Sequence, residues 1–171
     1  MKGVKAMTFR PMRRHQQQLP HEEAVQILQN STSGVLALLG DGDYPYAVPM
    51  SHFYTPERLY FHGAVEGHKV DAIRRHGKAS FCVVAQDDVK EETFTTHFCS
   101  VIAFGSIRIV EDEKEKRTAI TALAQRFSPG RDPSREIAGS MGHMHMLVMD
   151  IEHLTGKEAK ELMMQRKEHA R

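Results

Sequence analysis

The chain has 171 residues, with 23 Lys and Arg side chains against 22 Asp and Glu and a formal net charge of +1. This length predicts one domain. The near-neutral charge argues against a nucleic-acid-binding protein with a general basic excess, although it is compatible with local basic clusters. The apolar run at residues 35–39 is far shorter than the ~20 residues of a membrane helix, so no membrane partner is predicted.

A flexible arm is predicted over residues 1–18, followed by a single domain over residues 19–171, because the arm lacks apolar periodicity. The arm also lacks the apolar stretch of a signal peptide. Cys82 and Cys99 form no C-x-x-C pair, which favours a reducing cytoplasm over a disulfide framework. Three arginines of the arm either contact a phosphate or an acidic partner or belong to a disordered tail: Arg10, Arg13 and Arg14.

A short helix is predicted to begin at residues 19–20, because proline fits the first turn and two glutamates follow at the positive end of the helix dipole. After a polar break comes an apolar strand at 34–39 and a Gly/Asp turn at 40–43. Residues 44–54 predict a second strand, whose two prolines favour a sheet edge or a locally open section. With a return strand at 59–62, these runs indicate an antiparallel meander.

The middle of the chain alternates between helix and strand signals. Residues 67–76 predict a helix with one apolar side and a glycine stop after it. Residues 79–85 predict a strand, and the charged residues 86–92 are interpreted as a loop. A long β-rich stretch follows over 94–110, in which Gly105 is a candidate bulge or bend.

The clearest helix signal covers residues 112–127, where Asp112-x-x-Glu115 resembles a capping box in front of an apolar stripe. A further short helix is predicted to start at residues 132–133, and a last strand covers 144–151. A second capping box at Thr155 predicts a charged C-terminal helix. About six strands with helices at the connections predict an α+β, mainly β domain built on one antiparallel sheet or barrel.

The most informative segment, residues 60–69, reads as a strand, a loop of small residues and the start of a helix. A helix N-terminus offers unpaired N–H groups and a positive dipole end, which suit an anion. Gly63 and Gly67 allow close backbone approach, and Lys69 can reach a phosphate as a point charge. His68 can add positive charge. The alternative interpretation is a surface turn with a solvated lysine.

The proline-containing strand is a second candidate for ligand binding. Pro45 and Pro49 leave backbone groups outside the ladder, and such groups can bond the edge of a planar heterocycle. The alternative interpretation is an irregular edge strand without a ligand.

In combination these segments resemble the flavin-binding split β-barrel superfamily of the pyridoxamine-phosphate oxidases. Within it, the chain is most similar to the nitroimidazole-resistance proteins and related small flavoproteins. The resemblance covers residues 22–161 and depends on the order and spacing of several short stretches. Those stretches lie at residues 34–37, 43–49, 59–64, 66–74, 100–105 and 151–158.

The resemblance implies an antiparallel split β-barrel of Greek-key type and a homodimer that binds FMN at the subunit interface. One strand lines the isoalloxazine edge through its backbone, the next ends beside the flavin, Lys69 matches the phosphate-binding lysine of the family, and Ser100 falls at a flavin contact on the long strand. The implied cofactor contacts are Val48, Pro49, Met50, Ser51, Phe61, His62, His68, Lys69 and Ser100.

The sequence also departs from the family pattern. Family members usually carry Arg where this chain has His68, which implies weaker or pH-dependent phosphate affinity, because histidine titrates near ~6.5. The substrate-binding arginines and histidine of true pyridoxamine-phosphate oxidases have no match, which argues against vitamin B6 chemistry. His62 is the candidate catalytic acid or base, because this position faces the flavin pocket in the nitroimidazole-resistance branch. The alternative is a strand histidine bonded to a carbonyl.

The leading hypothesis is a flavin-dependent oxidoreductase acting on a small aromatic or nitro compound. The alternatives are a non-catalytic flavin- or haem-binding protein and a relative that uses deazaflavin. His143 and His145 alternate along a strand and share one face, which suits copper, nickel or haem. The alternative is a strand entry whose methionines pack inward, and no metal site is predicted.

Overall fold

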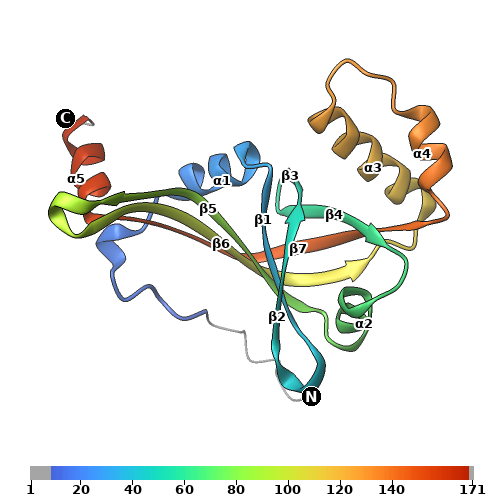
Figure 1. The fold of residues 1–171 in the computed structure, drawn as a ribbon, viewed down its shortest axis with the longest axis horizontal. Helices are drawn as coiled ribbons and strands as arrows, with labels where there is room; N and C mark the ends of the chain where they lie inside the picture. Colours follow the sequence, from blue (N-terminus) through green and yellow to red (C-terminus); the bar gives the residue numbers. More distant parts are fainter. Residues whose placement is uncertain (1–8, 170–171) are drawn as a thin grey trace, which may run out of the picture.

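The computed structural model describes residues 9–169, which form one seven-stranded antiparallel sheet and five α-helices (Figure 1). The predicted α+β class is confirmed. The strands are β1 (Ser33–Leu39), β2 (Pro45–Ser51), β3 (Phe53–Thr55), β4 (Arg58–Ala64), β5 (Lys78–Lys90), β6 (Thr95–Ile109) and β7 (Met144–Glu158). The helices are α1 (His21–Asn30), α2 (His68–Arg75), α3 (Glu113–Phe127), α4 (Ser134–Ser140) and α5 (Lys160–His169). Within the described range, no helix has the length and apolar character needed to cross a membrane.

The sheet curls into an open, split barrel. Its strand order is β2-β1-β5-β6-β7-β4-β3, so β2 and β3 lie at opposite edges although only His52 separates them in the chain. The two edges must therefore meet at His52. This residue is fully buried, and its Nε2 donates a hydrogen bond of 2.8 Å to the carbonyl oxygen of Leu28 in α1. The prediction of one strand over 44–54 within a meander is wrong, because the chain changes sheet edge at this residue.

The prolines explain why β2 is an edge strand. Pro45 and Pro49 have no N–H to donate, and an edge strand leaves one side of its backbone unpaired in any case. In the register, Pro49 lies opposite Val35 of β1, and no strand among residues 9–169 follows β2 on its other side. The predicted edge position is confirmed for this part of the described chain.

Two predicted boundaries are wrong because strand pairing outweighs local signals. Residues 86–90 continue β5 instead of forming a loop, since they pair with residues 95–99 of β6. Thr155 does not begin a helix, because it lies inside β7 and pairs with Ile102 of β6. Helix α5 begins only at Lys160. The local preference of charged or capping-box residues for a loop or a helix contributes less free energy than a full ladder of hydrogen bonds to the neighbouring strand.

The long strands bend at Gly105, as predicted. The β6–β7 register shifts between Phe104 and Gly105. A Cβ at Gly105 would collide with the carbonyl oxygen of Asp150, so only glycine lets the two backbones approach this closely.

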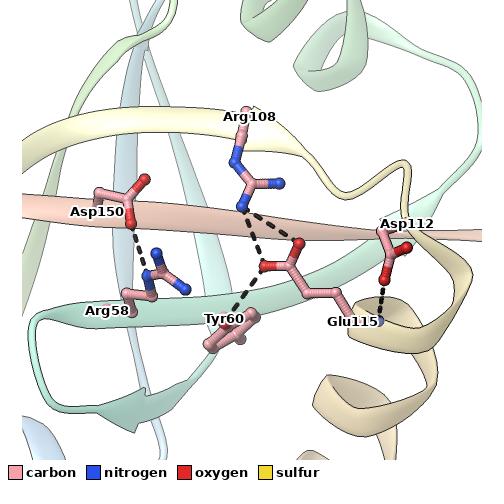
Figure 2. A network of polar contacts seen from close by, with 6 residues as sticks. All are labelled: Arg58, Tyr60, Arg108, Asp112, Glu115 and Asp150. Carbon is pink, nitrogen blue, oxygen red and sulfur yellow. Dashed lines mark hydrogen bonds and ion pairs between the residues drawn. The ribbon is translucent and has the colours of Figure 1, made fainter.

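A polar network fixes β4 against its neighbours (Figure 2). Arg58 Nε donates to Asp150 of β7 at 2.7 Å. Arg108 of β6 donates to both carboxylate oxygens of Glu115 in α3 at 3.0 and 3.3 Å, and the Tyr60 hydroxyl lies 3.5 Å from the same carboxylate. The network thus connects β4, β6, β7 and α3, and it holds the strand that leads into residues 61–63.

Helix α3 begins at a side-chain cap. The Asp112 carboxylate accepts a hydrogen bond of 2.7 Å from the backbone N–H of Glu115, which confirms half of the predicted capping box (Figure 2). The Glu115 carboxylate does not reach back to the cap, because it is bound to Arg108 and Tyr60.

The described part of the N-terminal arm lies along β7. The Phe9 ring stacks on His153 at 4.5 Å, and a 3-10 turn at His15–Gln17 leads into a bridge between Gln18 and Lys157. Residues 1–8 of the predicted arm lie outside the described residues, and its flexibility stays a prediction.

Candidate functional site

Three segments meet at Lys69. Helix α2 starts after Gly67, whose φ of 112° favours glycine, and Lys69 is its second residue. The Lys69 side chain folds back over Gly63 at the end of β4, where a Cβ would lie 2.7 Å from its Nζ. The Nζ donates to the Sδ of Met50 in β2 at 3.3 Å. The Gly-x-Lys spacing therefore brings an ammonium group to the end of β4 beside the N-terminus of α2.

Lys69 is a cation without a counter-ion in the described chain. It is half-buried, and its burial lowers the pKa of the ammonium group. No ion pair joins it to any carboxylate of residues 9–169. The thioether of Met50 is only a weak acceptor. Because a partly desolvated ammonium group without a strong partner is unfavourable, an anionic group at this position would stabilise it.

His62 and Phe61 point in opposite directions at the end of β4. Phe61 is fully buried and packs against Phe81, with ring centroids 5.1 Å apart. His62 lies on the outer side, next to Gly63. Partial burial and the charge of Lys69 lower the pKa of His62, which favours the neutral imidazole at neutral pH. A neutral imidazole carries one donor and one acceptor nitrogen.

His68 lies against the β1–β2 turn. Its ring stacks on Tyr46 at 4.1 Å, and its Nε2 accepts a hydrogen bond of 3.3 Å from the backbone N–H of Asp41. Arg75 binds the carboxylate of the same aspartate at 2.6 Å. These contacts hold α2 against the hairpin, and phosphate binding by His68 stays a prediction.

The predicted flavin strand, β2, presents two kinds of residue. Met50 is buried with its sulfur beside Lys69, and Val48 is half-buried against the core. Pro49 and Ser51 are exposed on the outer face of this edge strand. The strand therefore places an exposed backbone edge close to the lysine.

Ser100 lies far from this group within one chain. It pairs with Lys157 of β7, whereas His62 pairs with Met146 of the same strand. These two positions on β7 are separated by a strand length of roughly 35 Å, at about 3.3 Å per residue. In Figure 1, α5 lies at one end of the molecule and α2 lies well away from it, on the other side of the barrel. The predicted site residues thus form two groups.

Sequence reasoning missed a large groove near Ser100. It has a volume of ≈ 960 Å³ and lies between α1, β5 and α5. Inside it, the buried Glu158 carboxylate accepts hydrogen bonds from Arg166, and burial together with Glu158 and Glu23 raises the pKa of the Cys99 thiol. No local signal could reveal the groove, because it depends on residue 158 ending a strand instead of starting a helix.

The comparisons agree with this fold. The family model of pyridoxamine 5'-phosphate oxidase matches residues 20–158, so the chain belongs to that family. No curated protein matches the sequence. The identity to the solved structures below is under 25%, so their likeness shows a shared fold.

One similar structure is a putative 5-nitroimidazole antibiotic resistance protein from Bacteroides thetaiotaomicron VPI-5482, with a TM-score of 0.70, 18% identity, and coverage of 81% of this chain and 83% of that one. Another is the flavocytochrome Anf3 from Azotobacter vinelandii, with a TM-score of 0.71, 19% identity, and coverage of 88% and 72%. A third is the FAD and haem binding protein from Mycobacterium smegmatis, with a TM-score of 0.69, 21% identity, and coverage of 84% and 74%.

Proposed function

We propose that the protein is a homodimeric FMN-binding oxidoreductase that holds the flavin phosphate at Lys69. The observation that carries the proposal is the half-buried Lys69 ammonium group, which has only the Met50 sulfur as a polar partner among the described residues. A phosphate monoester would supply the missing negative charge. Family membership supports a flavin, and two of the similar structures are named for flavin binding.

The residues around Lys69 fit a phosphate group. The first N–H groups of α2 have no helical partner and point out of its N-terminus, beside the ammonium group. Gly67 leaves open space there, since a Cβ at this position meets nothing within 4 Å. Bound flavin supplies hydride and electron transfer, while the chain supplies binding and orientation.

His62 is the proposed proton donor or acceptor. It lies one residue before Gly63, over which Lys69 folds, and its lowered pKa keeps the ring neutral at neutral pH. One ring nitrogen can then donate a proton to a reduced substrate while the other accepts one. We propose a small aromatic or nitro compound as the substrate, which the likeness to the nitroimidazole resistance protein supports.

The homodimer is proposed because one chain separates the predicted site into two groups. Ser100 pairs with Lys157 of β7, whereas Gly63, over which Lys69 folds, pairs with His145 of the same strand, so the two groups lie toward opposite ends of the barrel. A twofold arrangement would bring Ser100 of one copy beside Lys69 of the other, so that each flavin contacts both copies. The free thiols of Cys82 and Cys99 support a reducing compartment, and we propose the cytoplasm.

The test is a titration of the purified protein with FMN, FAD and riboflavin, in which binding is monitored by flavin absorbance and flavin fluorescence. Mass spectrometry of any copurified cofactor separates FMN, FAD and deazaflavin, and sedimentation gives the oligomeric state. We expect a yellow dimer that prefers FMN to riboflavin. A colourless protein that takes up no added flavin contradicts the proposal.

Haem is a second candidate because of the surroundings of His145. This residue pairs with Gly63 on β4 and lines a separate cavity of ≈ 700 Å³ together with Arg74. An imidazole can ligate haem iron, and an arginine can bind a propionate. A Soret band on haem titration that His145→Ala removes would support this function. No spectral change with micromolar haem would exclude it.

A further inference from the structure

A small cavity of ≈ 450 Å³ lies where the N-terminal arm crosses α5. The arm forms a 3-10 turn there, in which Gln17 N–H donates to the Arg14 carbonyl oxygen at 3.0 Å. The backbone N–H of Leu19 then donates to the Gly156 carbonyl oxygen at 3.0 Å and fixes the turn to β7. The lining consists of Arg13, Arg14, His15, Gln16, Gln17, Lys160 and Met163.

The cavity concentrates positive charge in a nearly neutral protein. The whole chain carries a formal charge of +1, whereas the described residues of this lining include Arg13, Arg14 and Lys160 and no carboxylate. None of the three forms an ion pair with a carboxylate in the described part of the chain. Like charges held together raise the local potential, which attracts an anion.

Gln17 adds a neutral polar side chain to the cationic lining of the cavity. This residue is 7% exposed, and it lines the cavity. The NH₂ group of its side-chain amide can donate to an oxygen atom held between the cationic side chains.

The N-terminus of α5 adds to the positive electrostatic potential in the cavity. Lys160 is its first residue and Met163 lies one turn later on the same face, so the first N–H groups of a ten-residue helix lie at the cavity. The positive end of the helix dipole favours an anion here. Met163 is buried and gives the cavity an apolar wall beside the charges.

We propose that this cavity is a second anion site that binds the phosphate group of a small organic phosphate. Paired arginines match the geometry of phosphate oxygens, and the volume and the Met163 wall leave room for an apolar part of the molecule. The site is distinct from the proposed flavin phosphate site, since α5 and α2 lie on opposite sides of the molecule (Figure 1). It does not depend on the proposed flavin function.

The test is isothermal titration of the full chain with inorganic pyrophosphate and with AMP, at about 0.15 M salt to screen long-range attraction. The variant Arg14→Gln/Lys160→Gln removes two charges from the lining. The control Arg10→Gln/Lys167→Gln removes two exposed charges outside it. We expect the first variant to lose about tenfold or more in affinity for the bound probe, and the control to stay within about twofold. Binding of AMP above pyrophosphate identifies a nucleotide-type ligand, and the reverse order identifies a simple polyphosphate.

Gln17→Met keeps the volume of the side chain and removes its amide, so it should weaken binding several-fold. Lys69→Met should leave it unchanged, which separates this site from the proposed flavin site. Circular dichroism and the unfolding midpoint confirm that each variant folds. The proposal is overturned if neither probe binds, if the two double variants lose equal affinity, or if Lys69→Met abolishes binding.

Discussion

The ammonium nitrogen of Lys69 lies 3.3 Å from the thioether sulfur of Met50, so a cation from α2 contacts the edge strand β2 through a weak acceptor. The contact crosses the end of β4 at Gly63, where no side chain intervenes. Three segments that are separate in the chain therefore share one charged group. A substitution at Lys69 or at Gly63 changes this arrangement at a single position.

Lys69→Met should weaken FMN binding by about tenfold to a hundredfold, because a hydrogen bond to a charged group contributes about 1.5–3 kcal/mol. The affinity for riboflavin, which lacks the phosphate, should change little. Flavin fluorescence titration measures both constants. Lys167→Met, on the exposed face of α5, is the matched control. Equal losses for FMN and riboflavin would show that Lys69 does not bind the phosphate.

Gly63→Ala should displace Lys69 without unfolding the protein. The new Cβ would meet Nζ at 2.7 Å and Cε at 3.0 Å, and both atoms belong to the flexible end of a side chain. We expect about tenfold weaker FMN binding and a free energy of unfolding within about 1 kcal/mol of the wild type. Gly142→Ala, which meets nothing within 4 Å, is the control.

The same substitution in a Lys69→Met background tests the mechanism. If Gly63→Ala acts through the lysine, it should have no further effect on FMN affinity there, since residues in contact are not additive. A full additional loss would mean that the methyl group obstructs the flavin itself.

His52 should make the protein less stable in mild acid. Burial lowers the pKa of His52, whereas an unfolded histidine titrates near 6.5. As the pH falls below 6.5, the unfolded chain therefore binds a proton that the folded chain does not, and the free energy of unfolding falls by up to about 1.4 kcal/mol per pH unit until the folded pKa is reached.

Urea unfolding of the wild type and of His52→Gln between pH 8 and pH 5 measures this effect. Glutamine keeps an N–H donor for the Leu28 carbonyl oxygen but does not titrate. The other histidines with lowered pKa, His62 and His145, are present in both proteins, so the difference isolates His52. Parallel pH profiles would refute the assignment.

Gly105→Ala should destabilise the protein by about 2 kcal/mol or more, because its Cβ would collide with backbone that cannot move without breaking the β6–β7 ladder. Gly139→Ala is a control for which the expected change in stability has the opposite sign. Gly139 is exposed in α4 with open space around it, so alanine there should gain up to about 1 kcal/mol of helix propensity. Thermal or urea unfolding distinguishes the two.

A mixing experiment tests the proposed shared site. Lys69→Met and Ser100→Tyr should each weaken FMN binding alone. If each flavin contacts both copies, a mixed dimer regains one intact site, and an equal mixture should recover about a quarter of the binding capacity. No recovery after verified subunit exchange would place both residues in separate sites.

The sequence predicts features that depend on single residues. Pro45 and Pro49 indicate an edge strand because the missing N–H is a property of proline itself. Likewise, Gly105 predicts the bend, and Asp112 predicts the start of α3. The sequence also predicts Lys69 in the first turn of a helix, and the structure confirms that place.

Features that depend on distant partners could not be predicted. The alternation over 44–54 continues through His52, and only the pairing of Phe53 with Tyr60 shows that the chain has changed sheet edge there. Gln17 lines a cavity together with residues of α5, a helix that begins more than 140 residues later in the chain. Local patterns cannot report such contacts, because strand pairing and packing decide them.

The position of β4 in the sheet also determines when this strand can complete its pairing during synthesis. Within residues 9–169, this strand pairs with its hairpin partner β3 and otherwise only with β7, where Phe61 lies opposite Leu147. During synthesis, β4 must therefore wait for more than 80 further residues to leave the ribosome before its second neighbour exists. The strand end beneath Lys69 is one of the last parts to be secured, so flavin capture is expected to follow completion of the polypeptide.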